Sequence, residues 1–150
     1  MKTNNPDLFV FVIDGQRFAI PLEQTEIVLA AAEVEKVPEA PEFMVGCLDL
    51  HGEILPVISL HKKFNLLPGP LRPDQHFILC RTPTRKIILI ADSSEGVISD
   101  YPMVDPEKIA SFDETSFAGI VRDNQGLIFI FDMEKLINYR EELQIKNLIS

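Results

Sequence analysis

The chain has 150 residues, of which 46% are apolar, and this is enough for one folded domain with a buried core. Its 23 acidic and 14 basic residues give a formal charge of −9, which repels nucleic-acid phosphates and anionic lipid headgroups. We therefore expect no nucleic-acid partner. We also expect no direct membrane insertion, because no apolar run approaches the roughly 18 residues that a spanning helix needs.

The N-terminal segment lacks the pattern of an export signal. Its first apolar run, residues 8–13, is shorter than a signal-peptide core of about 7 to 15 residues. We therefore expect a cytoplasmic protein. In that reducing compartment Cys47 and Cys80 are expected to remain thiols rather than to form a disulfide.

Residues 8–22 predict a first β-hairpin. Two runs of aromatic and β-branched residues flank Asp14-Gly15, a dipeptide that suits the positive φ angles of a type I′ turn. Residues 23–28 could form a helical turn. Residues 34–37 alternate apolar and charged side chains, as a half-buried strand does.

Residues 45–60, VGCLDLHGEILPVISL, predict a second hairpin that turns at Gly52. Side chains two positions apart share one face of a strand, so Asp49 and His51 lie on one face and the two neighbouring leucines on the other. We expect the leucines to face the core. Asp49 and His51 would then form an exposed polar rim at the turn.

A proline lies inside the second strand of this hairpin. Pro56 cannot donate a ladder hydrogen bond, which favours an edge strand or a bulge. Residues 60–66 predict a short helical turn, and the proline-rich loop after them predicts a boundary between two lobes. We expect lobes of residues 8–67 and 74–131 within a single domain of residues 1–150.

The second half of the chain predicts two further hairpins. Residues 76–92 would form one, and residues 117–132 the other, with its turn at Asn124-Gln125-Gly126. Residues 96–98 predict a short strand. Residues 99–116 combine prolines and acids without periodicity and therefore predict a loop.

A C-terminal helix is predicted over about residues 132–146. It would begin with Asp132 as its N-cap, and its apolar stripe would run through Leu136, Tyr139 or Arg140, and Leu143. Many short strands joined by turns, without alternation of strands and helices, indicate a mainly β fold built from small antiparallel barrels. We expect two such barrels packed together, with the C-terminal helix added.

The sequence contains no motif of an enzyme active site. A nucleophile elbow, a phosphate-binding loop and a dinucleotide fingerprint are all missing, so we expect no enzyme. Cys47, His51 and His61 carry atoms that suit zinc, but structural zinc usually takes four ligands in close pairs, and Cys80 stands alone. Asp49 and His51 could pair as a base, yet no motif places a nucleophile beside them. We predict a binding module without a metal or cofactor.

Residues 37–66, VPEAPEFMVGCLDLHGEILPVISLHKKFNL, resemble the signature of the bacterial chemotaxis coupling protein family, the CheW-like domains. That signature runs P-x-x-P, an apolar pair, Gly, apolar-Asn-Leu-Arg-Gly and apolar-Pro-Val-apolar-Asp-Leu. The positions that match it in order are Pro38, Pro41, Gly46, Leu50, Gly52, Pro56, Val57, Ile58 and Leu60. The likeness covers about residues 8–137, with Asp92 and Asp132 also in place. It implies two five-stranded barrels packed on each other.

The resemblance also implies a function. CheW-like proteins are non-catalytic adaptors that couple the cytoplasmic tip of transmembrane chemoreceptors to the regulatory domain of a CheA-type histidine kinase in two-component chemotaxis signalling. The receptor hairpin would lie in the seam between the barrels and the kinase domain against the first barrel, in receptor arrays at the inner membrane. The receptor- and kinase-binding residues would be Gly46, Asp49, His51 and Glu53.

Three positions depart from the family pattern: Asp49 replaces Asn, His51 replaces Arg, and Ser59 replaces Asp. Arginine offers five donors on a permanent charge, whereas neutral histidine offers one donor and one acceptor. We hypothesise that His51 weakens binding, selects a divergent receptor, or restricts coupling to mildly acidic pH. Equal affinities of the parent, His51→Arg and His51→Ala would rule this out.

Two alternatives remain open. The first is a CheW-like scaffold of another system, such as pilus motility or a second-messenger pathway. The second is a barrel that binds a small ligand, which would need a central cavity with a few polar groups. Phe, Ile and Leu in nearly every predicted strand favour filled barrels instead.

Overall fold

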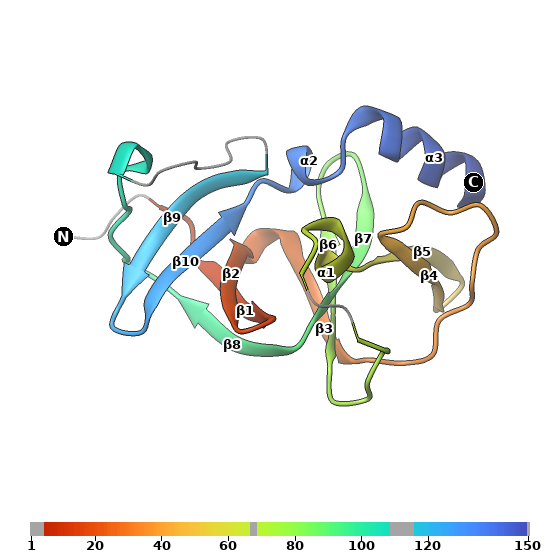
Figure 1. The fold of residues 1–150 in the computed structure, drawn as a ribbon, viewed down its shortest axis with the longest axis horizontal. Helices are drawn as coiled ribbons and strands as arrows, with labels where there is room; N and C mark the ends of the chain where they lie inside the picture. Colours follow the sequence, from red (N-terminus) through yellow and green to blue (C-terminus); the bar gives the residue numbers. More distant parts are fainter. Residues whose placement is uncertain (1–4, 67–68, 109–115, 150) are drawn as a thin grey trace.

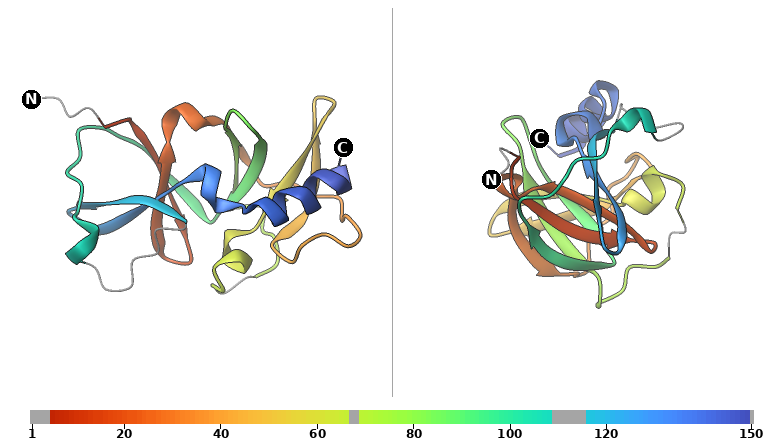
Figure 2. Two further views of the ribbon diagram at one scale, coloured as in Figure 1. Left: turned by 90° about the horizontal axis from the view of Figure 1, so that it is seen from above. Right: turned by 90° about the vertical axis from the view of Figure 1, so that its left-hand side faces the viewer.

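The computed structural model describes residues 5–66, 69–108 and 116–149. It contains two five-stranded sheets with the strand orders β8-β1-β2-β10-β9 and β3-β6-β7-β5-β4. The sheets lie next to each other along the long axis of the molecule, and the C-terminal helices run from the first towards the far end of the second (Figures 1 and 2). The strands are β1 (Leu8–Ile13), β2 (Gln16–Pro21), β3 (Thr25–Ala30), β4 (Met44–Leu50), β5 (Glu53–Ile58), β6 (His76–Arg81), β7 (Lys86–Ala91), β8 (Ser93–Ile98), β9 (Phe117–Asp123) and β10 (Gly126–Phe131).

The predicted mainly β fold with two five-stranded units is confirmed, but the sheets are neither purely antiparallel nor closed. Strand β10 pairs with β2 in parallel, and β5 pairs with β7 in parallel. Parallel neighbours require a crossover connection, which local turn signals do not reveal. The first sheet is nevertheless curled. Arg17 on β2 contacts Glu95 on β8 at 3.0 Å and Asp123 on β9 at 2.6 Å, so one side chain bridges the two edge strands.

The two sheets do not follow the predicted lobes of residues 8–67 and 74–131. The first sheet combines strands from both ends of the chain, and the second takes the strands between them. The chain passes from the first sheet to the second between β2 and β3 and returns between β7 and β8 (Figure 1). The proline-rich loop therefore lies inside the second sheet's share of the chain, between β5 and β6.

All four predicted hairpins are present. In the first, Asp14 and Gly15 have φ angles of 50° and 74°, as a type I′ turn requires. The predicted helical turn at residues 23–28 is wrong, because a 3₁₀ turn at Leu22–Gln24 leads directly into β3. The half-buried strand expected at residues 34–37 is reduced to one bridge between Glu35 and Cys47.

Pro56 lies on an interior strand, which corrects the expectation of an edge strand. Strand β5 has β4 on one side and β7 on the other. Cys47, which faces Pro56 in the ladder, exchanges its backbone hydrogen bonds with Glu35 instead, at 2.8 and 2.9 Å. The nitrogen of Pro56 therefore points towards β7, where pairing begins only at Val57. Proline lacks an N–H group, but at position 56 no partner on β7 requires one, so the sheet loses no hydrogen bond there.

The largest hydrophobic core joins the two sheets. Phe131 at the end of β10 is 1% exposed and packs on Phe18 and Phe117, with ring centroids 4.9 and 5.1 Å apart. Ile58 and Leu89 of the second sheet belong to the same core. Helix α1 (Leu60–Lys63), the predicted short helical turn, is followed by Phe64, which stacks 5.5 Å from Phe131.

The C-terminal helix is broken into α2 (Met133–Leu136) and α3 (Tyr139–Ile149) rather than continuous over residues 132–146. Asp132 caps α2 as predicted, since its carboxylate accepts hydrogen bonds from the backbone amides of Glu134 and Lys135. The predicted stripe through Leu143 is wrong, because Leu143 is 41% exposed and Ile145 is buried instead. In the part of the chain that the structure describes, no helix has the length and hydropathy needed to cross a membrane.

Candidate interaction surface

The predicted contact residues lie at and near the tip of the hairpin formed by β4 and β5. His51 and Gly52 form its two-residue turn, with φ angles of 54° and 88°. Oδ1 of Asp49 accepts a hydrogen bond of 2.8 Å from the Gly52 amide and so closes the turn. His51 is exposed, so its imidazole is presented to solvent on a closed turn rather than held in a catalytic site.

Gly46 is buried, and its role is to let another segment approach β4. A Cβ added at Gly46 would lie 2.3 Å from the carbonyl oxygen of Glu35 and 2.9 Å from Cγ2 of Val34. The two hydrogen bonds between Glu35 and Cys47 require this close approach. Gly46 therefore positions the hairpin and offers no side chain to a partner.

Glu53 is held in place by a lysine on a neighbouring strand. Nζ of Lys86 lies 2.8 Å from Oε1 of Glu53 and 3.5 Å from Oε2 of Glu26. The hydrogen bond with Glu53 raises the pKa of Lys86, and the negative charge of Glu26 adds to this effect. Partial burial acts in the opposite direction but does not cancel it. The three exposed side chains at the tip, Asp49, His51 and Glu53, are thus presented by a hairpin that an ion pair holds beside its turn.

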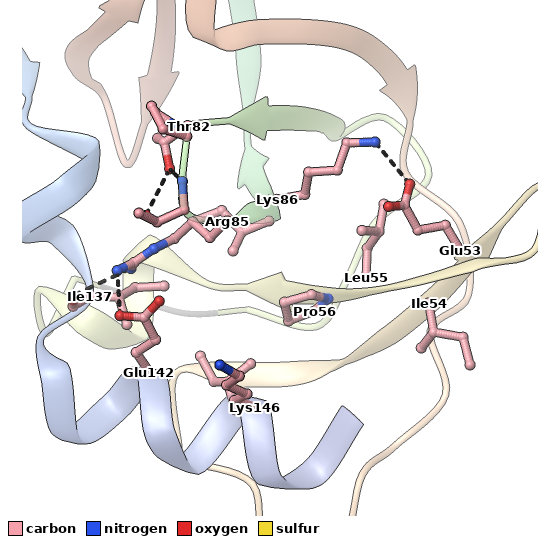
Figure 3. Close-up of a pocket in the computed structure, with 14 residues that line it drawn as sticks. Glu53, Ile54, Leu55, Pro56, Thr82, Arg85, Lys86, Ile137, Glu142 and Lys146 are labelled. Atoms are coloured by element: carbon pink, nitrogen blue, oxygen red, sulfur yellow. Dashed lines mark hydrogen bonds and ion pairs between the residues drawn. The ribbon is translucent and has the colours of Figure 1, made fainter. Parts of the chain in front are cut away.

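A hollow of about 510 Å³ begins at Glu53 and extends beneath α3 (Figure 3). Pro56 and Ile87 line it from the second sheet, and Ile145 lines it from α3. Ile54 stands at its mouth and is 50% exposed, so a large aliphatic side chain borders the hollow on its solvent side. The tip therefore continues into a partly apolar surface.

Asp92, in the family position between β7 and β8, ties the two sheets together. Its Oδ2 accepts hydrogen bonds from the Asp14 amide at 2.7 Å and from Nε2 of His61 at 3.1 Å, and Oδ1 accepts one from Gln75 at 2.9 Å. Burial alone would raise the pKa of Asp92, but these hydrogen bonds hold that pKa below its usual value.

The residues considered for zinc have other roles. His61 is 6% exposed and serves to orient Asp92, whereas His51 stands at the exposed turn. Cys47 and Cys80 are both free, and burial raises the pKa of each thiol. Within residues 5–66, 69–108 and 116–149, no group of three or more histidine, cysteine or acidic side chains is arranged to hold a metal ion.

Two of the three departures from the family pattern preserve local structure. The hydroxyl of Ser59 caps α1 by accepting from the Lys62 amide at 3.2 Å, a role that aspartate also performs. The carboxylate of Asp49 closes the turn as an asparagine amide oxygen could. His51 is left as the departure that changes what the tip offers to a partner.

Sequence reasoning missed the residues that support and extend the tip. Lys86, Arg85 and Ile54 were not singled out, although all three line the hollow beside Glu53. Lys86 lies 33 positions from Glu53 in the chain. A contact at that separation depends on the pairing of β5 with β7, and no motif in the sequence reports this pairing.

The chain matches a known family along most of its length. The family model described as "CheW-like domain" covers residues 7–141. Among curated relatives, a chemotaxis protein CheW of Treponema pallidum is 25% identical over 148 residues, which is 94% of this chain and 87% of the relative. A chemotaxis protein CheW of Thermotoga maritima is also 25% identical, over 93% of this chain and 91% of the relative.

A solved structure has the same fold. The scaffolding protein TtCheW from Thermoanaerobacter tengcongensis superposes with a TM-score of 0.80 at 24% identity, covering 94% of this chain and 96% of that one. The family model matches residues 7–141, which is most of the chain, and the chain therefore belongs to the family of CheW-like domains.

Proposed function

We propose that this protein is a non-catalytic adaptor that couples transmembrane chemoreceptors to a CheA-type histidine kinase in chemotaxis signalling. Membership of the CheW-like family and the names of the curated relatives support this role. The observation that carries it is the tip of the β4–β5 hairpin. Asp49, His51 and Glu53 are exposed at a turn that one side-chain hydrogen bond closes, and an ion pair with Lys86 supports Glu53. A preformed polar tip of this kind suits protein recognition, because little ordering entropy is lost on binding.

In this proposal the tip contacts the kinase regulatory domain or the receptor, and Gly46 acts by positioning the hairpin. The receptor's helical hairpin lies in the seam between the two sheets. The protein works in the cytoplasm and is recruited to receptor arrays at the inner membrane. A net charge of −9 means that a partner surface with basic side chains is favoured at long range.

Reconstitution tests this proposal directly. Purified protein would be mixed with a CheA-type kinase and a membrane-embedded chemoreceptor from the same genome, and kinase autophosphorylation would be followed with and without the protein. The expected result is receptor-dependent control of the kinase that requires the protein. Titration calorimetry of each partner alone would give the two binary affinities.

Two results would redirect the assignment. If neither chemotaxis partner binds and a kinase of a pilus or second-messenger system does, the protein is a scaffold of that other system. If neither kind of kinase binds and native mass spectrometry of the purified protein detects a bound metabolite, the small-ligand alternative replaces both. His51 at the exposed turn favours the first of these alternatives over the second, because it alters the recognition surface and leaves the core unchanged.

A further inference from the structure

The two C-terminal helices are anchored very differently. Around α2, Met133, Leu136 and Ile137 are 2%, 1% and 2% exposed, so this segment is part of the main core. In α3, Ile145 is the buried residue among the side chains that the structure describes, and Leu143 is 41% exposed. Ile145 belongs to the main core and Leu148 packs against that core while only partly buried, so α3 has less hydrophobic burial than α2 to hold it in place.

The break between the helices gives α3 its own beginning. Ile137 has an extended backbone, with φ −115° and ψ 118°. Asn138 and Glu141 then cap α3 reciprocally: Oδ1 of Asn138 accepts from the Glu141 amide at 2.8 Å, and Oε1 of Glu141 accepts from the Asn138 amide at 2.9 Å. Helix α3 can therefore keep its first turn whether or not it contacts the sheet.

Ion pairs with α1 and with the loop before β7 help to attach α3 to the rest of the molecule. Lys63 contacts Glu141 at 2.9 Å, and Arg85 contacts Glu142 at 2.9 Å. Glu142 is 35% exposed, so its pair with Arg85 is partly open to solvent and to added salt. Electrostatic attachment of this kind weakens as ionic strength rises, whereas the apolar contacts of α2 do not.

The packing beneath α3 is incomplete. The hollow shown in Figure 3 is lined by Ile145 of α3 and by Pro56 and Ile87 of the second sheet, so the contact between helix and sheet is open along part of its length. Arg85 donates to Glu142 and to the carbonyl oxygen of Ile137, yet its Nε is buried without an acceptor. An empty volume and an unpaired buried donor are both uncommon in a closely packed interface.

We propose that α3 is a displaceable strap, hinged at residues 137–138, that covers the apolar surface between β5 and β7. The hinge is fixed because Arg85 holds the Ile137 carbonyl and the Ile137 side chain is in the core. Release of the two ion pairs lets α3 move away as a helix. Pro56 and Ile87 then become accessible beside Ile54, which is already half exposed.

Hydrogen exchange measured by mass spectrometry on the full chain tests this inference. Amides of residues 139–149 should exchange faster than those of β10 and α2. Raising the salt concentration from about 0.1 to about 1 M, which shortens the Debye length from roughly 10 to 3 Å, should speed exchange in α3 alone. Glu142→Gln should raise the exchange rate of α3 by about two- to fivefold at low salt and should reduce its salt dependence.

Lys135→Met is the matched control. It also removes one member of an ion pair, the 3.9 Å contact with Asp132, but it lies on α2 and should leave exchange in α3 unchanged. Ile145→Ala gives an independent test, since it should increase exchange in α3 without changing β10. The inference is wrong if α3 exchanges as slowly as β10 and responds neither to salt nor to Glu142→Gln.

Discussion

At the scale of single residues, the tip of the β4–β5 hairpin depends on backbone geometry as well as on side-chain chemistry. His51 adopts a positive φ angle of 54°, a conformation that Asn, Asp and His tolerate better than most residues. Its neighbour Gly52 meets the same requirement with a φ angle of 88°. A substitution at position 51 therefore changes the energy of the turn together with the surface presented to a partner.

This geometry gives a stability prediction for His51. His51→Val should lower the free energy of unfolding by about 1 to 2 kcal/mol, because a β-branched side chain is strained at positive φ. His51→Asn should change it by less than about 0.5 kcal/mol. Urea unfolding followed by circular dichroism measures both. Arg122→Val, at an exposed position of β9, is the control, and an equal loss there would show that the turn conformation is not the cause.

A second prediction concerns Gly46. Gly46→Ala should destabilise the protein by about 1 to 3 kcal/mol, because the new methyl group would collide with the Glu35 carbonyl oxygen, a backbone atom. Gly69→Ala makes the same chemical change where the nearest atom is 4.0 Å away, and it should be neutral or slightly stabilising. Thermal unfolding of both variants measures this difference. Equal melting temperatures would show that the close approach of Glu35 does not require glycine at position 46.

At the scale of elements, the sequence predicts what neighbouring residues determine and misses what distant residues determine. The turns at Asp14-Gly15 and His51-Gly52 predict their hairpins, because two adjacent residues specify each turn. Residues 25–30 become a strand only because they pair with β6, some 50 positions later. The helix break was in principle visible, since Asn138 and Glu141 have the spacing of a capping box.

The ion-pair cluster on the first sheet predicts a pH dependence. Hydrogen bonds from Arg17 lower the pKa of Asp123 to about 2. In the unfolded chain the pKa is near 3.9, so this pair contributes stability above about pH 4 that is lost as pH falls towards 2. Asp123→Asn should therefore show a shallower loss of stability over that window than the parent. Guanidinium unfolding at several pH values measures it.

Asp74→Asn is the control for this experiment. It neutralises a carboxylate whose side chain is 73% exposed and whose partner, Arg72, is also largely exposed. Its pH profile should match that of the parent. If Asp123→Asn matches the parent too, Arg17 does not hold the two edge strands in the way described.

At the scale of the whole molecule, the two sheets form one unit because the chain and its buried polar groups cross between them. The predicted lobes failed at this scale, since the N-terminal hairpin pairs with the C-terminal strand β10 rather than with its own half of the chain. Asp92 fixes the crossing between β7 and β8 by accepting from Asp14 on one side and from His61 and Gln75 on the other. The family resemblance marked Asp92 but did not give its contacts.

Removal of this carboxylate should weaken the junction. Asp92→Ala should cost about 1 to 3 kcal/mol of unfolding free energy, because buried donors lose their acceptor. Unfolding should stay cooperative, since the aromatic core around Phe131 also joins the sheets. Asp74→Ala, at an exposed aspartate, should have little effect, and a similar small effect of Asp92→Ala would mean that the junction does not depend on this carboxylate.

If the tip of the β4–β5 hairpin binds the signalling partner, changing its exposed side chains should lower the affinity of the protein for that partner. A His51→Asn, Glu53→Gln double variant keeps the turn and removes the imidazole and one charge, and Glu107→Gln, on the 3₁₀ turn Pro106–Lys108, is the control. Calorimetric titration with the kinase regulatory domain and with a receptor-tip fragment should show at least a tenfold loss of affinity, about 1.4 kcal/mol, for one partner with the double variant. The control should bind like the parent. Unchanged affinity of the folded double variant for both partners would show that the tip is not the binding surface.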